Sequence, residues 1–456
     1  MSDMKSRFYR NLYCCLILLL IPAFAFAQPA TEPSDVGSQV QELRSEVQDL
    51  RSRLDAQSTA VIPTTRPAAI PFEKEGLLGL HAGWNPDKGF IIRSEDDSFL
   101  LHPWVFLQFR DATVYRSEAS ATEGAGTENG FELPRMKLIL DGNIVSRDLT
   151  YQFIWATQDT SGDLQLQDAW GRYHIPGTSL AVEGGQIRNP LDHEQYLFAT
   201  KSLTPDRSIV NNILLNGDDI VKGIELSCGY DDDSEVRGLA AFTSGQRNFD
   251  TDFEEYPVND ADWGTAGRIE WKALGNWKDY TQFTALGDRT DLLVFGGGLD
   301  YTEAGAAAAL THVVDVQYDC PSGASVYAAY LGRYTRDNAG AVTTNGEFTS
   351  TSTGRHDTYD TTARFMLAQL MCQRFEPFFR YEYIQFDPNE IPAGLNSTVN
   401  DFTLGCNYYF YGQRAKLSGD VSYLPNGSPV SNTISDLMAS HRGNELIVQL
   451  QFQLML

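Results

Sequence analysis

Charged and amide side chains recur at alternate positions along several segments of the chain, with apolar side chains between them. In the segment 131–146, Arg135 and Lys137 alternate with Met136 and Leu138. The same alternation places three further polar pairs on one face: Gln108 with Arg110, Arg380 with Glu382, and Lys416 with Asp420. If such faces surround water, opposed rows of charge set a field that controls which ions pass. The alternative is that the charges pair across neighbouring strands and only stabilise a wall.

A second set of charged residues lies in and beside one long connection, 191–217. Its candidate cations are Arg188, Lys201 and Arg207. Three acids oppose them: Asp192, Glu194 and Asp206. These charged groups are candidates to act on passing ions. The alternative is a solvated loop with ordinary surface charge.

The sequence offers little chemistry for catalysis or for a bound cofactor. His174 and His193 stand in no recognisable nucleophile motif, which a barrel hydrolase would need. The cysteines beyond residue 27 have no C-x-x-C spacing. The stretch 249–262 is rich in carboxylates, which could hold divalent cations, but it lacks EF-hand spacing and a solvated acidic loop is the favoured interpretation. We therefore expect no enzyme activity, no metal and no cofactor.

The alternating segments are predicted to be strands, and the last one, 445–456, is the clearest. Its even-numbered positions are apolar throughout, and four of its odd-numbered positions are polar: Glu445, Gln449, Gln451 and Gln453. Alternation with a period of two predicts a strand with one apolar and one polar face. The strand is longer than the five or six residues usual in soluble sheets. When tilted, it matches the thickness of a bilayer.

Sixteen such segments predict an all-β fold, a transmembrane antiparallel β-barrel, with eighteen strands as the alternative. We place them at about 98–116, 131–146, 149–160, 164–175, 178–190, 218–230, 235–246, 263–275, 292–302, 311–320, 324–336, 356–372, 375–387, 398–411, 414–424 and 445–456. A sheet in lipid must close on itself because no water satisfies an open edge. A barrel of this size encloses an aqueous channel.

The connections between these segments sort by parity. All the long connections follow odd-numbered strands, whereas those after even-numbered strands are tight, with one exception at 276–291. Short turns at one rim and long loops at the other are typical of outer-membrane barrels. Both chain ends of the barrel then lie at the rim with the short turns.

Composition and targeting signals agree with export. The chain has 456 residues and a net charge of −25, which argues against a nucleic-acid partner. Residues 1–27 combine basic residues, an apolar run and the small-x-small sequence Ala25-Phe26-Ala27. This pattern predicts a secretory signal peptide, cleaved before Gln28.

A short coiled-coil stalk is predicted between the signal peptide and the barrel. Apolar residues at Val36, Val40, Leu43, Val47, Leu50 and Leu54 have the 4-3 spacing of a coiled-coil seam. So short a helix is marginal alone, so we expect it to associate, as a homotrimer; a single solvated helix is the alternative. The predicted organisation is a signal peptide at 1–27, a stalk at 28–59, a proline-containing linker at 60–75 and a barrel at 76–456.

Three stretches share a pattern with a known family of channels. They are Leu-Pro-Arg-Met-Lys-Leu at 133–138, Leu-Gln-Asp-Ala-Trp at 166–170, and Gly-Gly-Gln-Ile-Arg-Asn-Pro at 184–190 followed by Glu194. Through them, the chain from about residue 85 onward resembles the phosphate-selective porin O/P family. The resemblance implies a sixteen-stranded trimeric porin whose third loop, here 191–217, folds inward and narrows the pore.

Two features depart from that family and change the functional expectation. The chain ends in Leu456 where such proteins usually end in Phe, and its strong negative charge differs from the basic ladder of phosphate-selective members. We predict an outer-membrane porin of a Gram-negative-type bacterium, surrounded by lipid, with its stalk in the periplasm. It would pass small hydrophilic solutes and inorganic ions with weak selectivity. The alternatives are a phosphate- or polyphosphate-selective anion channel, and a structural barrel that tethers the outer membrane through its stalk.

Overall fold

The computed structural model describes most of the chain beyond residue 78. The described ranges are 79–85, 89–117, 125–157, 162–215, 220–230, 234–246, 261–338, 356–391, 395–430, 435–437 and 443–456. The predicted signal peptide, stalk and linker lie outside them, as does most of the acidic stretch 249–262. Within these ranges, no helix is long and apolar enough to cross a membrane.

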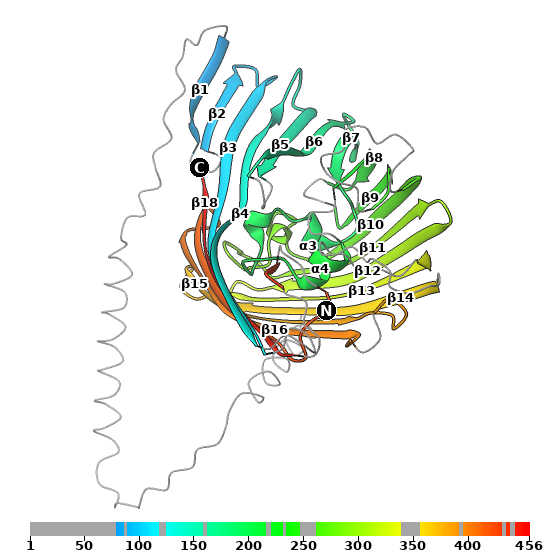
Figure 1. Ribbon diagram of the computed structural model, residues 1–456. Helices are drawn as coiled ribbons and strands as arrows, with labels where there is room; N and C mark the ends of the chain where they lie inside the picture. The colour runs from blue at the N-terminus through cyan, green and yellow to red at the C-terminus, as the bar shows by residue number, and fades with distance from the viewer. Residues whose placement is uncertain are drawn as a thin grey trace, which may run out of the picture. The chain divides into compact units, whose positions relative to one another are not determined.

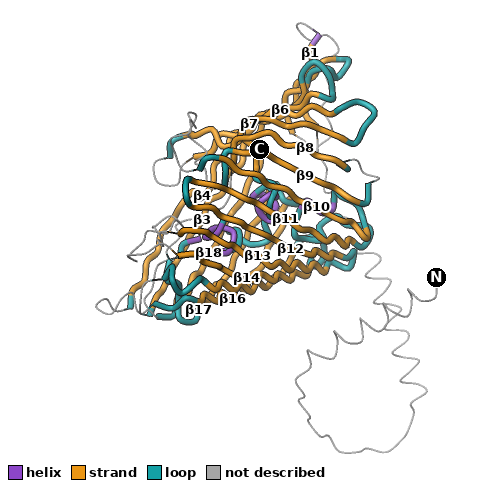
Figure 2. Tube along the Cα trace, turned by 90° about the vertical axis from the view of Figure 1, so that its right-hand side faces the viewer, coloured by secondary structure: helices purple, strands orange, loops and turns teal. Residues whose placement is uncertain are grey.

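Sixteen strands form a closed antiparallel ring, which confirms the predicted fold (Figure 1). They are β3 (Leu100–Arg116), β4 (Gly126–Asn143), β5 (Leu149–Thr157), β6 (Leu164–His174), β7 (Leu180–Arg188), β8 (Ile220–Cys228), β9 (Val236–Thr243), β10 (Trp263–Leu274), β11 (Leu292–Ala304), β12 (Ala307–Asp319), β13 (Ala324–Asn338), β14 (His356–Gln369), β15 (Phe375–Gln385), β16 (Thr398–Tyr411), β17 (Ala415–Leu424) and β18 (Glu445–Met455). Each strand pairs with the next, and β18 returns to β3 through pairs such as Gln451 with Arg110. Figure 2 shows these strands running obliquely side by side.

A hairpin outside the ring accounts for the other two strands of the sheet. It consists of β1 (Leu80–Asn85) and β2 (Gly89–Ser94), which pair with each other along their length. β2 joins β3 only through Ile92 with Leu101 and Arg93 with Leu100. The sheet therefore has eighteen strands, but the closed wall has sixteen. This hairpin was not anticipated from the sequence.

The two faces of the wall differ as the alternation predicted. On β18, the side chains of Leu450 and Phe452 are 52% and 39% exposed on the outside, whereas Gln451 and Gln453 are each 1% exposed on the inside. Large apolar side chains such as Ile269 and Leu404 are exposed on the outer face of other strands. The outer face is therefore suited to lipid, and the inner face is suited to polar contacts.

The two rims also differ as predicted. At the short-turn rim, Gly323 ends a four-residue turn with a φ of +100°, and a Cβ there would lie 2.1 Å from the Leu370 carbonyl oxygen, so only glycine fits. The exception after β10 carries the short helix η3 (Asp279–Thr281) and buries Trp277, Tyr280 and Phe283.

The long connection after β7 folds into the barrel, as Figure 1 shows by the position of its helices within the ring. It contains α3 (His193–Tyr196), η2 (Ala199–Lys201) and α4 (Ile209–Leu214). Asp192 caps α3 by accepting a hydrogen bond from the Gln195 amide, and Ser208 caps α4 by accepting one from the Asn211 amide. Residues 189–215, the described part of this connection, are called the third loop below.

Candidate constriction of the barrel lumen

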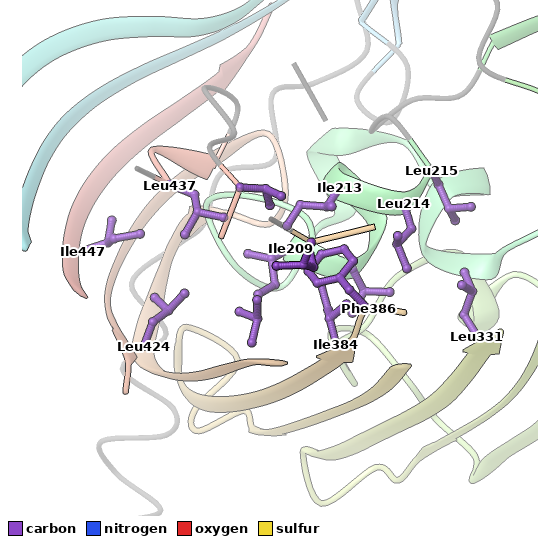
Figure 3. Packing of buried hydrophobic residues seen from close by; sticks show 14 of the residues in the cluster. Ile209, Ile213, Leu214, Leu215, Leu331, Ile384, Phe386, Leu424, Leu437 and Ile447 are labelled. Carbon is purple, nitrogen blue, oxygen red and sulfur yellow. The ribbon is translucent and has the colours of Figure 1, made fainter. Parts of the chain in front are cut away.

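An apolar layer on the inner wall seats α4 of the third loop (Figure 3). Ile209, Ile213 and Leu214 of α4 belong to one buried cluster with inward-facing residues of the wall. The wall residues come from strands β3, β12, β13 and β15 to β18: Val114, Val313, Leu331, Ile384, Val399, Leu424 and Ile447. Burying such a side chain is worth about 1.5–3 kcal/mol. This layer therefore fixes one side of the third loop to the wall.

A buried charge cluster continues the attachment next to α4. The guanidinium of Arg364 on β14 donates to Asp192 and, at 2.7 Å, to Glu194; the side chains of Arg364 and Asp192 are fully buried. Glu194 also accepts a hydrogen bond of 2.7 Å from the Ser208 amide. Burial opposes the ionisation of Asp192, but the Arg364 guanidinium, helped by Arg268, holds the pKa of Asp192 below its usual range.

A second charge cluster surrounds Asp206. Arg110 on β3 donates to Asp206, and Arg135 lies 3.6 Å from it. Gln449 on β18 donates to the same carboxylate at 2.9 Å. A carboxylate of the third loop therefore pairs with these two cations of the wall.

Arg380 and Glu382 on β15 complete the attachment. Arg380 donates to Thr204 at 2.8 Å and to the Asp206 carbonyl oxygen at 3.1 Å, and it lies 3.2 Å from Glu382. Glu382 accepts a hydrogen bond of 3.1 Å from the Ile209 amide at the start of α4. Both side chains are buried, and both contact the third loop.

The third loop also contacts the wall at β3, β4 and β5. Ala199 is buried with Phe106, Ile139 and Ile154 of β3, β4 and β5, and Phe198 packs against this group. Lys137 on β4 lies beneath this contact, 5.7 Å from the Phe198 ring, and donates to Gln167 at 2.6 Å. Because the loop leaves the wall at β7 and also contacts β14 and β15, it crosses the lumen.

The predicted loop cations have different surroundings. Arg188 lies 3.4 Å from Asp168 and donates to the Leu197 carbonyl oxygen at 3.0 Å. Arg207 is buried and donates to the same carbonyl oxygen at 2.7 Å, so it supports the fold of the loop. Lys201 lines a cavity, and burial lowers the pKa of its ammonium group.

The cavity beside Lys201 has a volume of about 720 Å³ and lies at the short-turn end of the lumen. The wall contributes Trp104 and Asp141, and the indole of Trp104 donates to Asp141 at 2.8 Å. The turn after β16 contributes Arg414, and the connection after β10 contributes Lys278 and Gln282 among others. Cations and acids thus line the same space.

The connection after β10 is the part of the site that the sequence analysis did not identify. The ring of Tyr280 stacks on His193 of α3 with ring centres 3.8 Å apart and an angle of 8° between planes. Burial and the positive charge of Arg268 lower the pKa of His193. The sequence did contain a signal for this connection: it is long, although the other connections after even-numbered predicted strands are short.

Comparisons with known proteins support the barrel fold. No family model matches the chain, and no curated protein sequence matches it. The anion-selective porin from Comamonas acidovorans is similar in structure, with a TM-score of 0.51 and 10% identity over 78% of this chain and 99% of that one. OmpF of Salmonella typhi, solved in complex with daunomycin, has a TM-score of 0.51 and 11% identity over 78% of this chain and 98% of that one. The chain therefore has the sixteen-stranded fold of outer-membrane porins.

Proposed function

We propose that the chain is an outer-membrane porin, a channel rather than an enzyme, for passive diffusion of small hydrophilic solutes and ions. The observation that carries this proposal is a closed ring with an apolar outer face and a polar inner face, crossed inside by the third loop. Lipid can cover the outer face only because closure leaves no unpaired strand edge. A loop inside the ring narrows the passage and brings charged groups to it.

The pairing of charges in the lumen favours weak selectivity. Five of the lumen cations each lie within 4 Å of a carboxylate: Arg110, Arg135, Arg188, Arg364 and Arg380. A ladder of one sign, which a phosphate-selective channel would use, needs cations without such partners. The structural similarity to an anion-selective porin extends to the fold, and the paired charges lead us to prefer a general porin.

Ion conductance tests this function directly. Purified protein is inserted into a planar bilayer, the single-channel conductance is recorded, and the reversal potential is measured in a KCl gradient. We expect ohmic conductance and a small reversal potential, with no saturable effect of added phosphate. Block of the chloride current by micromolar phosphate would restore the phosphate-selective alternative, and no conductance would favour the structural tether.

We also propose a homotrimer with a periplasmic stalk, supported by the coiled-coil spacing of 36–54. Deleting residues 28–60 should lower the temperature at which the trimer dissociates on unheated gels. Barrel contacts should keep the trimer assembled at low temperature. A wild-type protein that is monomeric by mass in mild detergent would contradict this assembly.

A further inference from the structure

The connection between β10 and β11, residues 275–291, fills part of the lumen from the short-turn rim; we call it the inner segment. The other connections at this rim that the structure describes in full are short, whereas this one buries three aromatic side chains, of Trp277, Tyr280 and Phe283. A solvated loop would leave these rings exposed to water. Burying an aromatic ring is strongly favourable, so these contacts stabilise the segment in its packed position. The inner segment is therefore a packed part of the barrel interior.

The base of the inner segment is fixed near the strand from which it leaves. The indole of Trp277 donates to the Ser234 carbonyl oxygen at 2.6 Å, before the start of β9. The Arg237 guanidinium lies over the same ring at 4.1 Å, and the Lys272 ammonium lies 5.1 Å from it. These contacts hold the start of the segment against β9 and β10.

The rest of the inner segment reaches strands farther round the ring. The Gln282 carbonyl oxygen accepts a hydrogen bond of 2.7 Å from Gln317 on β12. Thr284 donates to Glu376 on β15, and Gln413, in the turn after β16, donates to the Gln282 side chain at 3.4 Å. The segment thus runs from β9 and β10 toward β15 and β16 within the short-turn half of the lumen.

The inner segment also presses against the third loop. In addition to the stacked pair of Tyr280 and His193, the ring of Phe283 meets His193 edge-on with centres 5.3 Å apart. Phe283 shares a buried cluster with Leu197 and Leu203 of the third loop and with Tyr327 of the wall. The third loop is therefore clamped between the wall and the inner segment.

We propose that the inner segment is a second narrowing element of the channel: it limits the size of solutes at the short-turn end and positions the third loop. This inference rests on the proposed channel function. The cavity of about 720 Å³ lies between the two elements, because Lys201 of the third loop and Lys278 and Gln282 of the inner segment all line it. Solutes that leave the third loop toward this rim pass through that space.

Removing the two aromatic contacts tests the role of the inner segment. In Y280A/F283A, the segment loses its hold on the third loop, so we expect single-channel conductance to rise about twofold or more. Liposomes containing this variant should swell in sugars too large to enter wild-type liposomes. The matched control is W271A, whose aromatic ring lies on β10 just before the segment but on the outer face, 49% exposed. It should conduct as the wild type does.

A labelling experiment keeps the proposal testable if the double variant does not fold. Gln282→Cys places a thiol at the cavity, and a bulky thiol reagent added from the short-turn side should reduce conductance by at least half. Wild-type protein given the same reagent controls for Cys228, Cys372 and Cys406, which are exposed. A folded double variant with wild-type conductance and size limit, or a labelled cysteine variant that conducts unchanged, would show that the segment is only a brace. No conductance from the wild type would instead overturn the proposed function.

Discussion

The third loop and the inner segment both enter the lumen, but they are held by different forces. The third loop is held by buried opposite charges, such as Arg364 with Asp192, and by the apolar helix α4. The inner segment is held by stacked rings such as Tyr280 on His193, by hydrogen bonds such as that from Gln317 to the Gln282 carbonyl oxygen, and by the Arg237 guanidinium over the Trp277 ring. Replacing one residue of the first attachment should cost much free energy, whereas the second attachment consists of several weaker contacts.

This difference follows from the free energy of charges away from water. Removing one partner of a buried ion pair leaves the other uncompensated and costs about 3–5 kcal/mol. Losing a typical neutral hydrogen bond costs about 0.5–1.5 kcal/mol. We therefore expect the third loop to behave as part of the barrel, and the inner segment to be the more adjustable of the two elements.

The largest expected effect is that of Arg364→Met. The variant leaves Asp192 and Glu194 buried without their cation, so it should lower the free energy of unfolding by about 3–5 kcal/mol. Denaturant titration of the folded barrel, followed by gel mobility, measures this change. Arg336→Met is the control, because Arg336 is 48% exposed and lies 4.0 Å from Glu303; it should cost less than about 1 kcal/mol. Equal losses would show that the charge cluster does not hold the third loop.

Ile213→Ala should have the next largest effect. The side chain is fully buried between α4 and the wall, and its truncation should cost about 2–5 kcal/mol through lost contacts and a cavity. Faster protease cleavage within the third loop would report its release. Ile269→Ala, on the outer face at 66% exposure, should leave cleavage at the wild-type rate. If both variants are cleaved alike, the apolar layer is not the attachment.

The inner segment should respond to pH through Asp288. The pKa of Asp288 in the inner segment is raised to about 7, mainly by burial and then by repulsion from Asp319 and Asp279. The attraction of Lys278 opposes this shift. The folded form therefore takes up a proton as pH falls through about 7, whereas the unfolded form does so near pH 4. Falling pH thus stabilises the inner segment. The lowered pKa of Asp192 keeps this carboxylate of the third loop ionised over the same range.

A more stable inner segment should obstruct the lumen more, so we expect conductance to fall as the pH is lowered from 8 to 6.5. Asp288→Asn should reduce that change, because the amide is neutral at every pH. The range stops at about 6.5 because released His193 would take up a proton below it. The pKa of His193 is lowered in the folded form, so below that pH its protonation favours the released form and opposes the stabilisation by Asp288. Conductance that does not change with pH in the wild type would contradict the role assigned to Asp288.

The smallest expected effect is that of Lys201→Gln. The loss of one cation from the cavity should shift the reversal potential in a KCl gradient by a few millivolts toward cation preference. Arg147→Gln is the control, because Arg147 lies in the exposed turn after β4 and pairs with Asp97, away from the cavity. A shift equal to that of the control would remove Lys201 from the permeation path.

The sequence alone determined the wall of this protein. An alternation such as that of Leu450 and Gln451 needs no tertiary information, because a strand turns successive side chains to opposite faces. Sixteen such strands and the parity of their connections led to the closed ring, and the length of the 191–217 connection marked the third loop. The inward position of Arg110, Lys137, Arg380 and Glu382 followed from the same alternation.

Only the tertiary structure decided what these inward groups do. Arg110 and Asp206 are 96 positions apart and Arg364 and Asp192 are 172 apart, and no local pattern specifies which partners a folded loop brings together. The same holds for the inner segment, where the sequence showed an unusually long connection, but its stacking on His193 depends on where the third loop lies. Alternation is a property of one strand, whereas the filling of the lumen depends on packing between segments that the chain brings together only after the ring closes.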